Sequence, residues 1–162
     1  MNITLENMFS AAAGRYPTRA ESAMLTSWAA TLDARIAAVH ELAETEEKIV
    51  NLAAAEVMRS APELRKRGEE TQTKTARDMA LVLRHCAHAL LRDDVEYLDR
   101  ELLVWLRSVL VGLGFQPRFL ASSYRLLLIA VEECLSPRAA KLLKPYLSHC
   151  VRALGERQRE AS

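Results

Sequence analysis

The sequence predicts an all-α fold, and three observations lead to this prediction. Apolar residues recur at intervals of three and four along almost the whole chain, as they do on one face of a helix. Runs of alternating β-branched residues, which would indicate strands, are missing. The 162 residues are 50% hydrophobic and include only 5 glycines and 5 prolines, so residues 1–162 are expected to form one domain with a substantial core.

The first 30 residues predict a helical hairpin. A helix is expected over residues 2–13 and should end at Gly14, because glycine readily adopts the positive φ of a helix C-cap. The second helix of the hairpin should begin after Thr18, since Thr18 and Glu21 have the spacing of a capping box. Residues 1–30 are therefore interpreted as a hairpin that precedes a core at 31–156.

Further helices follow along the rest of the chain. The second helix is expected to run over 19–46, with a bend, and the pattern then predicts helices at 47–60, 73–91, 94–112, 118–133 and 137–155. Residues 63–74, ELRKRGEETQTK, form the only long loop. Ser136 is expected to cap the last helix and Pro145 to kink it.

This number of helices favours one kind of packing. About seven helices joined by short corners are too many for a simple four-helix bundle, so a globin-like arrangement around a central pocket is predicted. An irregular helical bundle is the alternative. Four aromatic residues at helical spacing could line such a pocket, but packing in the core is the favoured role: Trp105, Phe115, Phe119 and Tyr124.

Composition and charge exclude several classes of protein. A net charge of +1 lacks the basic excess typical of nucleic-acid binding. Cys86, Cys134 and Cys150 are odd in number and widely spaced, which argues against a disulfide framework or a metal site and for a reducing compartment. The longest stretch without a formal charge, residues 22–32, is too short to span a membrane. The N-terminal segment carries Glu6 where a signal peptide would have a lysine or arginine. A cytoplasmic protein is expected.

The helix at 73–91 carries an acidic residue on its apolar face. Residues that share this face are spaced at helical intervals: Thr75, Asp78, Met79, Val82, Cys86 and Ala89. A carboxylate among core-facing residues needs a partner. The simpler interpretation is that Asp78 only complements the helix macrodipole in the first turn.

Three segments of the chain resemble the phycobiliprotein family. They are TARDMALVLRHCAHAL, YLDRELLVWLRSVLVGLG, and the stretch from AAAGRYPTRAESAMLTSWAA to VMRSAPEL. The most specific parts are Ala-Arg-Asp-Met at 76–79, with Leu83 and Arg84 after it, and Leu106-Arg107 with Leu113-Gly114. The chain resembles the phycocyanin and allophycocyanin subunits of light-harvesting antennae over nearly its whole length, and the β-type subunits most.

The resemblance implies a globin-like fold with an N-terminal helical hairpin and a bilin, an open-chain tetrapyrrole, along the helix that begins near Thr75. It implies that Asp78 accepts hydrogen bonds from the pyrrole N–H groups and that Arg77 pairs with a propionate. Lys74, Arg84 and His85 complete the candidate cofactor-binding residues. In the family, the position of Thr75 is a cysteine that forms a thioether to the bilin, and a threonine hydroxyl is far less nucleophilic than a thiolate.

Other positions also differ from the family pattern. Ala11 replaces an aspartate and His88 replaces a tyrosine of the contact between subunits, and Cys134 lies too early to match a second attachment cysteine. The chain is therefore similar to the anchor-less relatives called bilin biosynthesis-associated globins. The resemblance implies a non-enzymatic protein that binds or carries a bilin reversibly, with bilin-biosynthesis enzymes as partners.

Two alternatives remain open. His85 and His88 make haem the rival ligand, although residues 94–112 contain no histidine where haem globins take their proximal ligand. The other alternative is a ligand-free oligomeric scaffold. The hairpin has more apolar side chains than two helices can bury, so a homodimer through it is expected: Met8, Phe9, Met24, Leu25 and Trp28.

Overall fold

The computed structural model describes residues 3–68 and 70–156, and most of these residues lie in helices joined by short turns. The α-helices are α1 (Ile3–Ala11), α2 (Arg19–Ala30), α3 (Leu32–Ser60), α4 (Thr71–Arg92), α5 (Glu96–Leu98), α6 (Val104–Gly112), α7 (Pro117–Cys134) and α8 (Pro137–Gly155). A 3₁₀ helix covers Pro62–Arg67 and a π-helical segment covers Asp99–Leu103. The described residues contain no strand, which confirms the predicted fold class.

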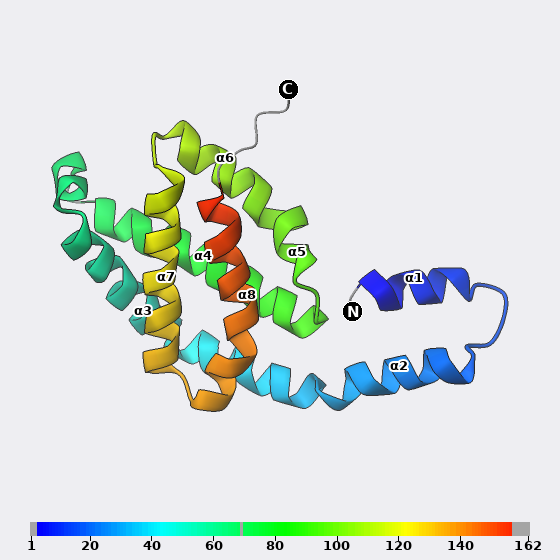
Figure 1. The fold of residues 1–162 in the computed structure, drawn as a ribbon. Helices are drawn as coiled ribbons and strands as arrows, with labels where there is room; N and C mark the ends of the chain where they lie inside the picture. Colours follow the sequence, from blue (N-terminus) through cyan, green and yellow to red (C-terminus); the bar gives the residue numbers. More distant parts are fainter. Residues whose placement is uncertain (1–2, 69, 157–162) are drawn as a thin grey trace, which may run out of the picture.

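The body of the molecule consists of four long helices. α3 packs along α4, α7 packs along α8, and both α7 and α8 contact α3. Figure 1 shows α7 and α8 in front of α4, while α5 and α6 close one side of the body. Each of the four helices contributes a fully buried side chain to the core: Ile49, Leu83, Leu127 and Leu143. The arrangement is the globin-like packing that the helix count predicted.

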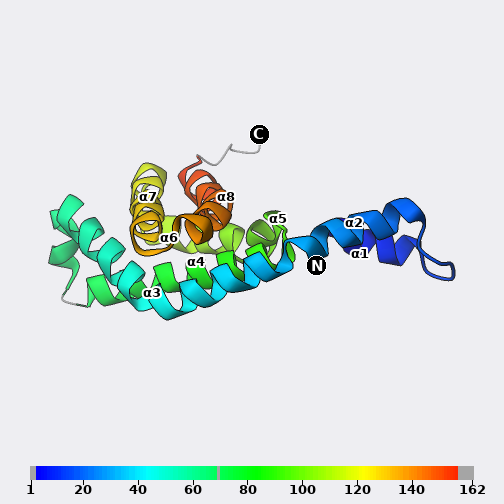
Figure 2. The same cartoon turned by 90° about the horizontal axis from the view of Figure 1, so that it is seen from below.

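The N-terminal hairpin projects from this body. α1 folds back along α2, and Figure 2 shows both helices beyond the end of α3. α1 buries Leu5 and Met8, whereas Phe9 and Met24 are each about two-fifths exposed. Gly14 has a φ of +87° in the turn, as its position predicted. The hairpin thus covers part of its apolar surface by itself and leaves part open.

The capping box predicted at the start of α2 is present. Thr18 Oγ1 accepts a hydrogen bond from the Glu21 backbone N–H, and the Glu21 carboxylate accepts one from the Thr18 N–H. Arg15 makes two further bonds to the same carboxylate, at 2.7 and 2.9 Å. These hydrogen bonds, that from Arg15 first, lower the pKa of Glu21 to about 2.

Acid is therefore expected to loosen the turn before α2. The pKa of Glu21 is lower in the folded chain than in the unfolded chain, so its contribution to stability is present above about pH 4.5 and disappears as the pH falls towards 2. Amide exchange of residues 18–22, measured by NMR between pH 5 and 2.5, should accelerate relative to α7. The Glu21→Gln variant should show the faster exchange already at pH 5. Equal acceleration in both helices would contradict this local effect.

Two predicted helix boundaries are wrong. One helix was predicted to end at residue 46 and the next to begin at residue 47, but the structure has no break there. Instead the chain bends at Thr31, and α3 is continuous from Leu32 to Ser60. The residues around Glu46 and Glu47 are good helix formers, so nothing interrupts the helix there. The bend at Thr31 depends on contacts with α4 that local sequence does not encode.

Arg35 supplies those contacts. Its side chain is only 2% exposed and lies between the end of α2 and the end of α4. The guanidinium donates to the Trp28 and Leu91 carbonyls, both at 2.6 Å, with longer bonds to the Thr31 and Leu90 carbonyls. A buried cation thus binds carbonyl groups at two helix C-termini, where the macrodipole favours positive charge.

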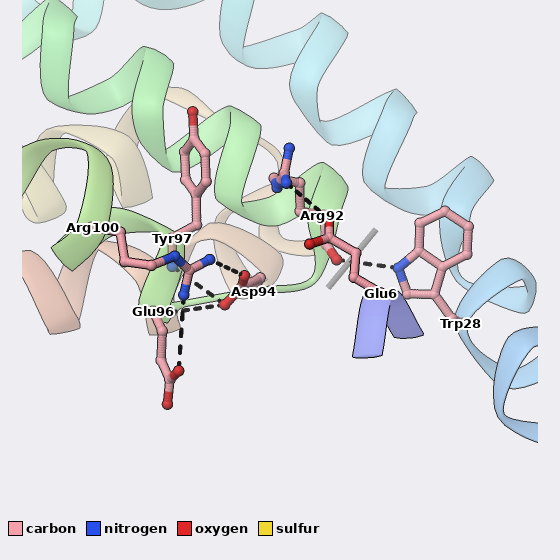
Figure 3. Close-up of polar contacts among 7 residues, drawn as sticks. All are labelled: Glu6, Trp28, Arg92, Asp94, Glu96, Tyr97 and Arg100. Carbon is pink, nitrogen blue, oxygen red and sulfur yellow. Dashed lines mark hydrogen bonds and ion pairs between the residues drawn. The ribbon is translucent and has the colours of Figure 1, made fainter. Parts of the chain in front are cut away.

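A second group of polar contacts joins the hairpin to the body. Figure 3 shows Trp28 and Glu6 beside Arg92, the last residue of α4. Trp28 Nε1 donates to the Arg92 carbonyl at 3.2 Å, and the Arg92 guanidinium pairs with Glu6 at 3.1 Å. The same guanidinium lies 5.1 Å from the centre of the Tyr97 ring. These contacts set the direction in which the hairpin leaves the body.

The remaining corners differ from the prediction in detail. The loop predicted at 63–74 is mostly structured, because the 3₁₀ helix fills its first part and α4 begins at Thr71. Asp94 begins α5 by accepting hydrogen bonds from the backbone N–H groups of Glu96 and Tyr97. Trp105 was expected in the core but is 59% exposed on α6. None of the helices in the described ranges is both long and apolar enough to cross a membrane.

Candidate functional site

One face of α4 lines a small cavity between the helices of the body. Thr71, Thr75, Asp78 and Met79 follow helical spacing on this face. The 3₁₀ segment, α3, α6, α7 and the turn between α6 and α7 supply the other described residues of the wall: Leu64, Val57, Leu110, Phe115, Phe119, Leu120, Ser123 and Tyr124. The apolar face of this helix was predicted correctly, and Met79, Val82, Cys86 and Ala89 are all buried.

Among the described residues of this wall, Asp78 is the only acidic one. Its side chain is half-buried, and burial raises the pKa of its carboxyl group, an effect that the neighbouring Arg77 charge opposes. Burial, and then the negative charge of Asp78, raise the pKa of the Tyr124 hydroxyl. Within the described ranges, no residue donates a hydrogen bond to the Asp78 carboxylate. An unpartnered, partly desolvated acceptor is therefore turned toward an apolar cavity.

The cavity is small, with a volume of about 60 Å³. Pockets that hold drug-sized ligands usually measure several hundred Å³, roughly 300 to 1,000. The rings of Phe115 and Phe119, which line the cavity, stack with their centres 5.6 Å apart. The cavity is therefore much smaller than the central pocket expected from a globin-like fold, and a large ligand fits only if side chains of the wall, such as Leu64 or these rings, move.

The predicted cationic residues do not gather around Asp78. Arg77, Lys74 and Arg84 are all exposed. Lys74 pairs with Glu70 at 3.0 Å, and Arg84 makes two bonds to Glu46, at 2.6 and 3.0 Å. None of the three lines the cavity, because each lies on the solvent side of α4.

Thr75 and His85 also have local partners. Thr75 lines the cavity and donates its hydroxyl to the Thr71 carbonyl at 2.9 Å. His85 lies outside the cavity wall, where its Nδ1 is 2.9 Å from the Leu81 carbonyl oxygen and its ring stacks on Tyr97. Histidine, cysteine and acidic side chains of the described ranges form no group of three or more that could hold a metal ion.

Several residues of the cavity wall were not singled out as site residues. Thr71 lies one turn before Thr75 on the same face of α4, so helical spacing could have indicated it. Ser123 and Leu110 come from α7 and α6, and only the arrangement of the helices in the body brings them to the cavity. Phe115, Phe119 and Tyr124 were interpreted as core residues, and they are both core and cavity wall.

Comparison with known proteins shows a match to one protein family and to two similar relatives. Residues 10–154 match the family of phycobilisome proteins. The allophycocyanin alpha-B chain of Cyanophora paradoxa is 24% identical over 145 residues, which is 86% of this chain and 90% of the relative. The allophycocyanin subunit alpha-B of a Picosynechococcus species is 26% identical over the same shares. Both relatives are alpha-B chains, whereas the motifs of the sequence resembled β-type subunits most.

Proposed function

Because the chain belongs to the phycobilisome protein family, we propose that it is a non-enzymatic bilin-binding protein that holds its pigment reversibly. The observation that carries the proposal is Asp78, a half-buried carboxylate without a hydrogen-bond donor, on the wall of an apolar cavity. A bilin offers what this group lacks, because its pyrrole N–H groups are donors and its rings are largely apolar.

Thr75 explains why the binding would be reversible. It lies three residues before Asp78 on the same face of α4, so its side chain is about 4.5 Å away along the helix axis. A threonine hydroxyl is not acidic enough to add to a bilin as a thiolate does. Cys86 is fully buried further along α4 and does not line the cavity. A pigment at Asp78 would therefore have no tether.

Entry of the pigment would require the cavity to open. The 3₁₀ segment Pro62–Arg67 is a short element of the wall. It directly follows α3 and contributes Leu64 to the cavity. We propose that this segment and the Phe115 and Phe119 rings move apart when a bilin binds. Such a protein would suit the transfer of a bilin to or from the enzymes of bilin biosynthesis, because a pigment without a tether can be released.

The volume of the cavity supports a second candidate, a ligand-free scaffold. A cavity of about 60 Å³ that is walled by the protein's own rings needs no ligand to complete the core. His85, by contrast, gives haem little support, since it lies outside the cavity wall.

Titration with two tetrapyrroles separates these functions. Purified protein is mixed with biliverdin and, separately, with hemin, and absorption and circular dichroism spectra are recorded. Reversible bilin binding predicts a red-shifted biliverdin band with induced circular dichroism, and a protein band that is colourless on a denaturing gel. A Soret band that the His85→Ala variant loses would favour haem. No spectral change with either compound would favour the scaffold and contradict the proposal.

The surface of the hairpin supports a homodimer. Phe9 and Met24 are exposed, and a groove of about 940 Å³ separates the hairpin from the body. Trp28, Leu142 and Tyr146 line this groove, so its wall is largely apolar. We propose that a second copy of the chain covers these side chains, since a soluble monomer rarely leaves such a surface open.

The Phe9→Asp variant is expected to weaken this dimer by about tenfold or more, because an aspartate cannot replace the apolar surface that Phe9 would bury. Light scattering after size exclusion, over a concentration series, measures the dissociation constant. Ile129→Asp is the matched control, since Ile129 is similarly exposed and belongs to α7, a helix that Figure 1 shows away from the hairpin. A wild-type monomer at every concentration would contradict the dimer.

A further inference from the structure

Two cysteines from different helices meet in the core. The Sγ atoms of Cys86 on α4 and Cys150 on α8 are 3.7 Å apart, and neither residue has any exposed surface. α4 and α8 pack directly on each other, so the pair lies in a contact between two main helices of the body. Cys134, at the end of α7, is only partly buried and is not part of the pair.

The surroundings keep both sulfurs unreactive while the core is closed. The hydrogen bond with Cys150, and then burial, raise the pKa of the Cys86 thiol. The thiolate is the form that reacts with oxidants, and it is disfavoured in an environment without water. The thiols can therefore react with an oxidant only after local unfolding opens the contact between α4 and α8.

We propose that Cys86 and Cys150 form a latent disulfide that a peroxide closes, joining α4 to α8. In the first step, one thiolate attacks an oxygen of hydrogen peroxide and the O–O bond breaks, which gives a sulfenic acid and one water after proton uptake. The second thiol then attacks the sulfenic sulfur and releases a second water. Two thiols lose two electrons in total, and one peroxide gains them.

The geometry favours this pair over any pair that includes Cys134. A disulfide needs sulfur atoms about 2.05 Å apart, and the side chains of Cys86 and Cys150 already point at each other. The two residues are 64 positions apart, so the bond would close a long loop and restrict the unfolded chain. The oxidised protein should therefore melt at a temperature several degrees higher than the reduced protein.

Peptide mapping tests the proposal on the full-length protein. Reduced protein is incubated with hydrogen peroxide under native conditions, quenched with catalase, and denatured in excess N-ethylmaleimide. The expected product has lost two hydrogen atoms, carries one maleimide at Cys134, and yields a linked peptide that contains Cys86 and Cys150. The Cys134→Ser variant should form the same link, whereas Cys86→Ser and Cys150→Ser should not.

The wild-type map decides the question even if a core variant fails to fold. Three maleimides on the oxidised protein, a link that includes Cys134, or sulfinic acid at Cys86 without a link would overturn the proposal. A linked protein that melts at a lower temperature than the reduced protein would show that the native packing cannot hold the bond, and would overturn it too. These results are independent of whether the protein binds a bilin.

Discussion

Replacing Arg35 with methionine is expected to lower the free energy of unfolding by about 3 kcal/mol. The guanidinium is almost fully buried and donates short bonds to the carbonyls of Trp28 and Leu91. Methionine fills a similar volume but donates nothing, so the Leu91 carbonyl would lose its bond to Arg35, and the Trp28 carbonyl would keep only the longer bond from the Thr31 hydroxyl. Urea unfolding at pH 7, followed by circular dichroism, measures the loss.

Arg35→Lys is the matched control for this experiment. Lysine keeps the positive charge near the end of α4 but cannot reach carbonyls of both helix ends, because it lacks the planar fork of the guanidinium. The free energy of unfolding of Arg35→Lys should therefore lie between that of the wild type and that of Arg35→Met. A loss below about 1 kcal/mol in Arg35→Met would mean that the joint between α2, α3 and α4 does not depend on this side chain.

The Asp78→Asn variant is expected to bind biliverdin at least about tenfold more weakly than the wild type, because hydrogen bonds to a charged acceptor are stronger than those to a neutral amide. The amide also brings its own N–H donors toward the pyrrole N–H groups. Absorption titration measures the change, with Asp33→Asn, an exposed site on α3, as control. Equal affinities of all three proteins for biliverdin would show that Asp78 does not contact the bilin.

The same substitution should stabilise the ligand-free protein at neutral pH. Burial raises the pKa of Asp78 in the folded state, so its favourable contribution to stability is present below its ordinary value of 3.8 and is lost as the pH rises through the folded pKa. Above that pH the wild type carries a partly desolvated charge that asparagine does not. The variant should therefore melt at a higher temperature than the wild type at pH 7, and the difference should vanish near pH 3.

Local sequence predicts the features that depend on neighbouring residues. The capping box of Thr18 and Glu21 and the positive φ of Gly14 follow from residue types within one turn. The ion pair of Lys74 with Glu70 is equally local, because the two residues are four positions apart on one helix face. The inward position of Asp78 follows from helical spacing alone.

Contacts between distant segments explain the predictions that failed. The bend at Thr31 depends on Arg35, whose partners Leu90 and Leu91 lie 55 and 56 positions along the chain. The size of the cavity at Asp78 depends on how α7 brings Phe119 against α4, and periodicity carries no information about that distance. A sequence can indicate which side chains face inward, but not how much space they leave.

Thiol footprinting at position 75 tests the account most directly. A Thr75→Cys substitution in a Cys134→Ser background places a reactive thiol in the cavity wall, and Ser122→Cys in the same background gives an exposed thiol on α7 as control. Maleimide labelling is timed with and without saturating biliverdin. The account predicts labelling several-fold slower at position 75 with biliverdin and unchanged at position 122. Unchanged labelling at both positions, while spectra show that biliverdin is bound, would contradict it.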